Sequence, residues 1–297
     1  MRKDVKLEYF WPSDDMTKKF LLDLVNRCLP VDVNAVVTSV FVNDRLGRKI
    51  RDYIRNRLGI EFSVEDSQRR MYNIVKPAIS TNTRNIWYTG ENVRPPSDQE
   101  WDAFLSFEKD SNTNRNLYLP FWATRLGENL EVSSEMQMQL LVSRKVSPER
   151  KLFACAFVGN PEPHRMRAIE AISRIAKVDC YGKAFGRPVE NKIDILKRYN
   201  FNICFENDLY PGYVTEKAIE SWLGGAIPIW WGLDSENYLN SRALVNFAEG
   251  DFENKLEEIS TISKDPDRIM LMQGEPILER AFDFKSLESK LRKLLAN

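Results

Sequence analysis

The stretch FNICFENDLYPGYVTEKAIESWLGGAIPIWWG, which begins at Phe201, carries several side chains that can do chemistry. Carboxylates can accept hydrogen bonds or protons, a phenol can donate a hydrogen bond, and an ammonium group can bind an anion. The residues of these types that follow the first apolar segment are Glu206, Tyr213, Glu216 and Lys217. Their proximity along the chain indicates a site for a polar, anionic ligand.

The elements around these residues are expected to place them at the edge of a parallel sheet. FNICFE is predicted to be a buried strand that ends at Glu206, and a helix is predicted to begin near Tyr213–Thr215. Glu216 and Lys217 then fall in the first helical turn, where unpaired backbone N–H groups attract phosphate. A lysine in this turn opposes the helix dipole and is tolerated when an anion neutralises it. A surface lysine paired with a carboxylate is the alternative.

A second strand–loop–helix unit, FVGNPEPHRMRAIEAI, also carries cations at its predicted helix start. Arg165 and Arg167 fall in that first turn, and arginine suits bidentate binding of phosphate. Two solvated surface arginines are the alternative. Neither GxxxxGKS/T nor GxGxxG occurs in the chain, so an anion here is not held as ATPases or dehydrogenases hold it.

The sequence offers no pattern typical of a metal site. It has one histidine, His164, and four cysteines without a CxxC pair, which we expect to be small buried residues in a reducing compartment. The DPD segment at Asp265–Asp267 imitates a DxD metal motif. Because Pro266 suits the first position of a helix, Asp265 is interpreted as a helix cap. We therefore expect that no metal or cofactor is required.

The composition excludes several classes of protein. Lys and Arg number 43 and Asp and Glu also number 43, so the balanced charge argues against a nucleic-acid-binding protein. No window reaches the roughly 18 apolar residues that span a bilayer, and the N-terminus lacks a signal peptide. The expected location is the cytoplasm, with at most weak peripheral contact at the inner membrane through the basic C-terminal segment SKLRKLL.

Strand and helix patterns alternate along the chain, which predicts a doubly wound α/β fold. The predicted strands cover residues 5–11, 32–41, 84–92, 103–108, 116–122, 151–159, 177–182, 201–206, 226–232 and 243–247. The predicted helices cover residues 15–28, 47–59, 164–176, 191–199, 214–225 and 286–297. A polar helix and linker over residues 127–150 separates two α/β domains.

The chain resembles the α-1,3/4-fucosyltransferases, glycosyltransferase family 10, and especially their bacterial members. The family pattern runs Phe-Glu-Asn, a short loop, Tyr-Val-Thr-Glu-Lys, a helix, Gly and Ile/Val-Pro-Ile, and here it reads FEND…GYVTEKAIESWLGGAIPI. NIWYTGENVRP and GNPEPHRMRAIEAI resemble two further family motifs, so the resemblance extends over roughly residues 85–250. The family usually has a serine where this chain has Asp208.

The resemblance implies a GT-B architecture, in which two Rossmann-like domains face a central cleft. Residues 1–145 are expected to bind the acceptor, and residues 146–297, with the C-terminal helices, to bind the GDP-sugar. The implied reaction is inverting transfer of L-fucose from GDP-β-L-fucose to O3 of a GlcNAc- or glucose-type acceptor. The expected setting is bacterial protein glycosylation or lipopolysaccharide biosynthesis.

Site residues follow from the resemblance position by position. Glu91, in the turn YTGEN, corresponds to the proposed catalytic base, and Arg165 and Lys217 are expected on the diphosphate. The full set of expected donor-binding residues is Arg165, Glu206, Asn207, Tyr213, Thr215, Glu216 and Lys217. Trp11 precedes a polar turn and is our candidate for acceptor contact. Two alternatives stay open, namely another GDP-6-deoxyhexose as donor, and a non-catalytic module that binds GDP-sugars or glycans.

Overall fold

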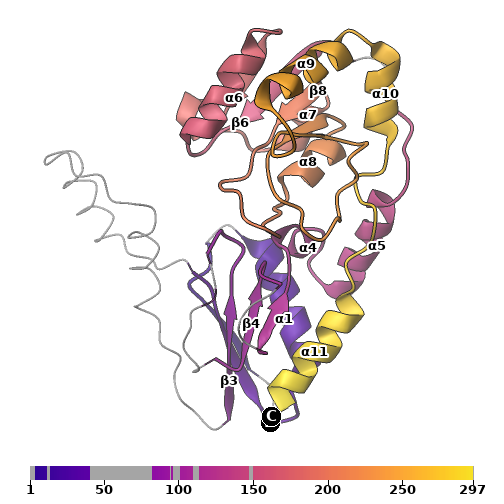
Figure 1. Cartoon of the computed structure of the whole chain (residues 1–297). Helices are drawn as coiled ribbons and strands as arrows, with labels where there is room; N and C mark the ends of the chain where they lie inside the picture. The colour runs from indigo at the N-terminus through magenta and orange to yellow at the C-terminus, as the bar shows by residue number, and fades with distance from the viewer. Residues whose placement is uncertain are drawn as a thin grey trace, which may run out of the picture. The chain divides into compact units, whose positions relative to one another are not determined.

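The computed structural model describes residues 4–11, 14–40, 82–93, 95, 101–109, 114–146 and 150–296 (Figure 1). The expected basic helix at residues 47–59 lies outside these ranges. The chain forms two compact units, each of which is described by itself. Unit 1 comprises Met1–Leu119, Gly127–Val132 and Asp283–Asn297, and unit 2 comprises Pro120–Leu126 and Ser133–Phe282.

The alternation of strands and helices that the sequence predicted is confirmed. The first half contains β1 (Val5–Glu8), α1 (Asp15–Cys28), β2 (Asn34–Thr38), β3 (Thr83–Tyr88), β4 (Ala103–Ser106), β5 (Asn116–Tyr118), α4 (Phe121–Thr124) and α5 (Leu130–Leu140). The second half contains β6 (Leu152–Phe157), α6 (Pro163–Ser173), β7 (Val178–Tyr181), η1 (Lys183–Phe185), α7 (Lys192–Leu196), β8 (Tyr199–Ile203), α8 (Lys217–Leu223), β9 (Ile227–Trp230), β10 (Val245–Asn246), α9 (Phe252–Ser263), α10 (Pro266–Gly274) and α11 (Phe284–Ala296).

Several boundaries differ from the predicted ones for local reasons. β1 ends at Glu8 instead of residue 11, since Tyr9 takes a φ of 58°, which no strand accommodates. The expected strand over residues 116–122 gives way to helix α4 after Pro120, whose fixed φ of −67° suits a helix start. α8 begins at Lys217 rather than near residue 214, so Glu216 is its N-cap residue.

Each unit is built on a parallel sheet of five strands. In unit 1 the order β1-β2-β3-β4-β5 follows the chain among the described strands. In unit 2 the order is β10-β9-β8-β6-β7, so the direction in which strands are added reverses between β6 and β8. Such a reversal opens a crevice at the carboxyl ends of the two strands, and this is where α/β sheets bind ligands.

Two apolar clusters cover the two faces of the sheet in unit 2. Ala154 and Ala156 of β6 pack in one cluster with residues of α6, α9 and α10. Cys155, which lies between them, packs in the other cluster with Leu196 and Tyr199. Because successive residues of a strand point to opposite faces, β6 is buried on both sides, as its apolar sequence predicted.

The C-terminal helix α11 belongs to unit 1, whereas the expected domain division assigned residues 146–297 to the second domain. It packs beside α1 and against β4 and β5 (Figure 1). Phe284 contacts Phe20 of α1 with ring centroids 5.5 Å apart, and the carbonyl of Leu295 accepts a hydrogen bond from Arg84 Nε at 2.9 Å. The apolar face of the amphipathic helix α11 is therefore buried against the rest of unit 1. Among the described residues, no helix has the length and apolar composition to cross a bilayer.

If α11 completes the core of unit 1, then truncating its buried face should unfold that unit more easily. Leu291 is 0% exposed, and Leu291→Ala should lower the free energy of unfolding by about 2–5 kcal/mol. Lys290→Ala is the matched control, because Lys290 is exposed on the same helix. Urea denaturation followed by circular dichroism compares the two variants, and equal stabilities would contradict this packing.

Candidate functional site

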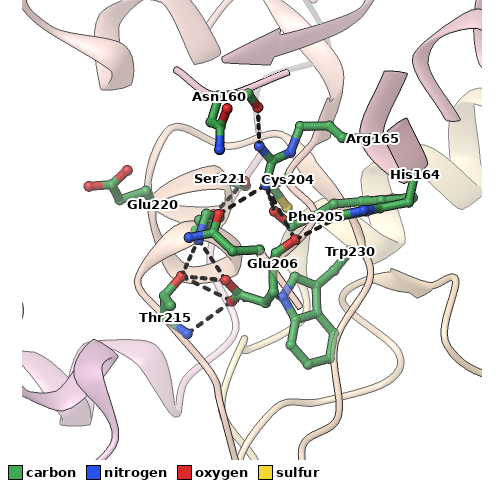
Figure 2. Close-up of polar contacts among 12 residues, drawn as sticks. Asn160, His164, Arg165, Cys204, Phe205, Glu206, Thr215, Glu220, Ser221 and Trp230 are labelled. Atoms are coloured by element: carbon green, nitrogen blue, oxygen red, sulfur yellow. Dashed lines mark hydrogen bonds and ion pairs between the residues drawn. The ribbon is translucent and has the colours of Figure 1, made fainter. Parts of the chain in front are cut away.

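Glu206 organises the carboxyl end of β8. Its side chain is 0% exposed, although it lies three positions beyond Ile203, the last residue of the strand. Oε1 accepts hydrogen bonds from the Thr215 backbone N–H at 2.9 Å and from Trp230 Nε1 at 3.2 Å. Oε2 accepts from Thr215 Oγ1 at 2.7 Å and from Lys217 Nζ at 2.6 Å (Figure 2). The carboxylate thus ties together the end of β8, the segment before α8, and β9.

These contacts change the role expected for two residues. Glu206 and Thr215 were expected to contact a donor, but both carboxylate oxygens of Glu206 are engaged by the protein, and Thr215 is 2% exposed with its hydroxyl on Glu206. The structure therefore assigns both residues to the internal framework of the site. The sequence could not distinguish this role, because framework and ligand-facing residues lie in the same motif.

Lys217 is the cation that this framework presents. Lys217 Nζ donates a hydrogen bond to Glu206 and another, at 2.9 Å, to Thr215 Oγ1. These two bonds use two of the three N–H groups of Lys217. The side chain is 24% exposed, and an ammonium group has a third N–H donor. Burial lowers the pKa of Lys217, but the Glu206 and Glu216 carboxylates outweigh it and raise the pKa above its ordinary value. Lys217 is therefore a fixed positive charge at neutral pH.

Glu216 lies beside Lys217 with an unsatisfied carboxylate oxygen. Its Oε2 atom is buried and has no hydrogen-bond partner among the described residues. Burial alone raises the pKa of Glu216, but the positive charges of Lys217 and Lys192 outweigh it, so the pKa lies below its ordinary value. A buried, ionised oxygen without a donor is costly, and a ligand hydroxyl is the kind of group that satisfies it.

Arg165 lies on the other side of the β6–β8 crossover point and is 6% exposed. Nη1 donates to the carbonyl of Asn160 at 2.7 Å, and Nη2 donates to the carbonyl of Phe205 at 3.0 Å and to Asn207 Oδ1 at 3.1 Å. Burial lowers the pKa of this guanidinium, while Glu206 counteracts the effect. Arg165 therefore joins the loops after β6 and β8, and it holds the exposed Asn207 at their junction.

Tyr213 and Arg167 were also expected at the site, but Tyr213 is buried and Arg167 packs elsewhere. Tyr213 is 2% exposed and therefore buried in the interior of unit 2. Arg167 was expected beside Arg165, but its guanidinium lies over the Phe252 ring at 5.0 Å from the ring centroid. Helical geometry separates the two arginines, because residues two apart on a helix point in different directions.

Two residues of the site were not predicted. Trp230 donates to Glu206, and the His164 ring lies 4.3 Å from the Trp231 ring, with Nε2 3.3 Å from the carbonyl oxygen of Glu206. Their positions carried a usable signal, since each directly adjoins the carboxyl end of a strand or the start of a helix in this sheet. Trp230 is 1% exposed, so it is a core side chain that also contacts the Glu206 carboxylate.

The expected catalytic and acceptor residues lie in unit 1. Glu91 follows β3 in a turn fixed by Thr89, whose Oγ1 donates to the Glu91 carbonyl at 2.9 Å and accepts from the Glu91 N–H at 3.1 Å. Trp11 is 44% exposed just beyond β1, and the preceding Phe10 stacks on Tyr88 at the end of β3, with ring centroids 5.7 Å apart. Trp11 and Glu91 thus follow strands that end at the same edge of one parallel sheet.

The DPD segment is confirmed as a helix cap. Asp265 Oδ1 accepts the backbone N–H of Arg268 at 3.0 Å, and Pro266 is the first residue of α10. In the part of the chain that the structure describes, no group of three or more His, Cys, Asp or Glu residues could hold a metal ion. The four cysteines are free, and Cys28, Cys155 and Cys204 are buried.

The two α/β units, each built on a parallel sheet of five strands, are those of a GT-B fold. A crystal structure of an α1,3-fucosyltransferase matches 99% of this chain and 90% of its own, with a TM-score of 0.67 and 20% identity. A crystal structure of an α1,3-fucosyltransferase with GDP-fucose matches the same shares, with a TM-score of 0.65 and 19% identity. These matches show the fold, because identity is low.

Sequence comparison indicates which family of glycosyltransferases the chain resembles. Residues 147–267 match the model of glycosyltransferase family 10 (fucosyltransferase), C-terminal part, and this range contains Arg165 and the whole segment from Glu206 to Lys217. The alpha-(1,3)-fucosyltransferase FucT of Helicobacter pylori is 29% identical over 212 residues, which cover 61% of this chain and 44% of that protein. The chain therefore matches less than half the length of this relative. It resembles the family-10 fucosyltransferases in sequence and in fold.

Removal of the buried carboxylate should show how far the site depends on it. Glu206→Gln should lower the free energy of unfolding by about 3 kcal/mol, because Lys217 and the donors around it lose their charged acceptor. The pKa of Lys217 is raised in the folded protein. The Glu206–Lys217 pair therefore stabilises the folded protein fully at pH values below the ordinary lysine pKa. This contribution is lost only as the pH rises through the higher folded pKa.

Glu220→Gln provides the control, measured in the same urea titrations at pH 7. Its partner Lys192 is 45% exposed and Glu220 is 27% exposed, so this substitution should cost less than about 1 kcal/mol. A Glu206→Gln variant as stable as Glu220→Gln would mean that the carboxylate does not organise the site.

Proposed function

We propose that the protein is an α-1,3-fucosyltransferase that moves L-fucose from GDP-β-L-fucose to O3 of a GlcNAc- or glucose-type sugar in a glycan or lipopolysaccharide. The observation that carries the proposal is the pair Glu216 and Lys217 at the β6–β8 crossover of unit 2. An unsatisfied carboxylate oxygen and a fixed ammonium charge lie side by side there, on residues that match the fucosyltransferase family model. The two groups suit a ligand with hydroxyls and a diphosphate.

The proposed reaction is a single inverting displacement. Glu91 takes the proton of the acceptor hydroxyl, whose oxygen bonds to C1 of fucose while the bond from C1 to the GDP oxygen breaks. The electron pair of that bond leaves on the diphosphate, and the β-linked donor gives an α-linked product. Lys217 meets the growing negative charge, and its fixed position means that little reorganisation is needed during the reaction.

The donor residues divide into contacts and supports in this proposal. Lys217, Glu216 and Asn207 face the donor. Glu206 and Arg165 hold these residues in place from behind, through a buried carboxylate and a set of backbone carbonyls. Preorganisation of this kind is what makes electrostatic stabilisation of a leaving group effective. Trp11 contributes an exposed aromatic surface for an acceptor sugar.

An acceptor array with GDP-β-L-fucose tests the proposal directly. Product mass identifies the transferred sugar, and NMR of the product gives the linkage and the anomeric configuration. If sugar is transferred from another GDP-6-deoxyhexose but not from GDP-fucose, then that other sugar nucleotide is the donor and the proposed donor is wrong. Binding of GDP-fucose without any release of GDP, with or without acceptors, would identify a non-catalytic binding module.

Glu91→Gln separates the proposed base from donor binding. The substitution keeps the shape and removes the charge, so kcat should fall by about 100-fold or more while the affinity for GDP-fucose stays near the wild-type value. Glu216→Gln is the matched comparison, since it makes the same chemical change in unit 2. This variant should weaken binding of GDP-fucose in calorimetry. Full turnover by Glu91→Gln would place the base elsewhere.

We further propose that transfer needs no resident metal ion, since the positive charge at the proposed diphosphate site comes from Lys217. After dialysis against EDTA, the enzyme should keep most of its turnover in an assay of GDP release. Modest stimulation by a free divalent ion agrees with this prediction, because such ions bridge diphosphates. Complete loss of turnover, restored by one particular divalent ion, would contradict it.

A further inference from the structure

His164 lies where the three loops of the candidate site meet, and it is the single histidine of the chain. It follows Pro163 at the start of α6, and its ring is half-buried. The imidazole packs on the Trp231 indole just after β9, with ring centroids 4.3 Å apart and planes at 31°. On the β8 side it lies nearly parallel to the Phe205 ring, at 6.5 Å (Figure 2).

The contact to the β8 loop fixes which ring nitrogen carries a proton. His164 Nε2 lies 3.3 Å from the carbonyl oxygen of Glu206, which can only accept, so Nε2 carries the hydrogen. The same carbonyl accepts a hydrogen bond from Arg165 Nη2 at 3.3 Å. Nδ1 then holds the lone pair of the neutral ring. A second proton can bind at Nδ1 without breaking the contact to Glu206.

Two cationic side chains and a helix start lie around the imidazole. Arg165 on α6 donates to the same carbonyl, Lys217 on α8 pairs with the Glu206 carboxylate on β8, and the helix start adds partial positive charge. Two acidic groups, Glu206 and then Glu162 just before α6, influence Arg165, and Glu162 accepts a hydrogen bond from Asn160 Nδ2 at 2.6 Å. Trp231 and Phe205 are uncharged. An anion at this crossover favours the charged ring.

We propose that His164 is a donor-binding residue, which takes up a proton at Nδ1 when the diphosphate of a nucleotide-sugar binds beside the ends of β6 and β8, so that donor affinity increases as the pH falls. The proposal rests on the proposed function, because the diphosphate supplies the anion. It assigns to this site a third cation, which is present only when the imidazole is protonated. Arg165 and Lys217, in contrast, stay charged throughout the neutral range.

Calorimetry with GDP-β-L-fucose between pH 5.5 and 8 tests the proposal. Both phosphates of this donor are esterified, so its charge is constant in this range, whereas the terminal phosphate of GDP titrates near pH 6. Wild-type affinity should be about three- to tenfold higher at pH 5.5 than at pH 8, the range over which histidine ordinarily changes charge. His164→Gln keeps an N–H donor near the Glu206 carbonyl but cannot titrate, and its affinity should be independent of pH.

Proton NMR of the untagged protein reports the charge state independently of affinity. With a single histidine in the chain, the imidazole C2–H signal belongs to His164. Its titration midpoint should move to higher pH when GDP-fucose is added. His164→Phe, which keeps an aromatic ring against Trp231, serves as the second variant and should also bind with pH-independent affinity. An unchanged midpoint, or the same pH dependence in His164→Gln as in the wild type, would overturn the proposal.

Two other donors distinguish this inference from the proposed function. GDP-mannose and UDP-glucose carry the same diphosphate with different sugars or bases. If one of them binds in place of GDP-fucose with the expected pH dependence, the role of His164 stands and the assignment of fucose falls. If GDP-fucose binds and is turned over with an affinity that does not change with pH, the proposed function stands and the role of His164 falls. Binding of none of the three contradicts both.

Discussion

The buried carboxylate of Glu206 is the interaction on which the candidate site depends. A charge at 0% exposure is stable only when it is paired and hydrogen-bonded, and the protein supplies donors from three parts of unit 2. Thr215 precedes α8, Lys217 is the first residue of α8, and Trp230 is the last residue of β9. Residues 215–217 cannot move away without removing the donors of Thr215 and Lys217 from the Glu206 carboxylate. The position and charge of Lys217 therefore follow from the cost of burying Glu206.

Strand order determines where this interaction lies. In unit 2 the order reverses between β6 and β8, and such a reversal is where α/β sheets place polar ligand-binding groups. Arg165 on α6 donates to the carbonyls of Asn160 and Phe205, one from the loop after each of these strands. In unit 1 the described strands follow the chain order, with no such reversal among them. The position of the polar site thus follows from the strand order. Arg165 and Glu206 then hold its loops in place through their hydrogen bonds.

The site combines groups that are satisfied with groups that are not, and the difference indicates where a ligand acts. Glu206 and Arg165 direct their hydrogen bonds to the protein, whereas among the described residues Glu216 Oε2 has no hydrogen-bond partner and the Lys217 side chain is 24% exposed. The Lys217 ammonium is held in place by Glu206 and Thr215, so it is a preorganised charge for an anionic molecule. The His164 ring lies beside these groups, with Nε2 3.3 Å from the carbonyl oxygen of Glu206.

The sequence by itself determined the alternating α/β fold, most strands and helices, the cap at Asp265 and the segment that carries the site, because these depend on local periodicity, capping and a short motif. Tertiary structure alone decided which motif residues face a ligand. Glu206 and Lys217 lie in one motif, yet one is buried and the other partly exposed, since distant partners such as Trp230 on β9 select the buried side chain. The placement of α11 in unit 1 was decided in the same way. Its amphipathic pattern predicts a buried face, but only the packing against α1 specifies which core that face completes.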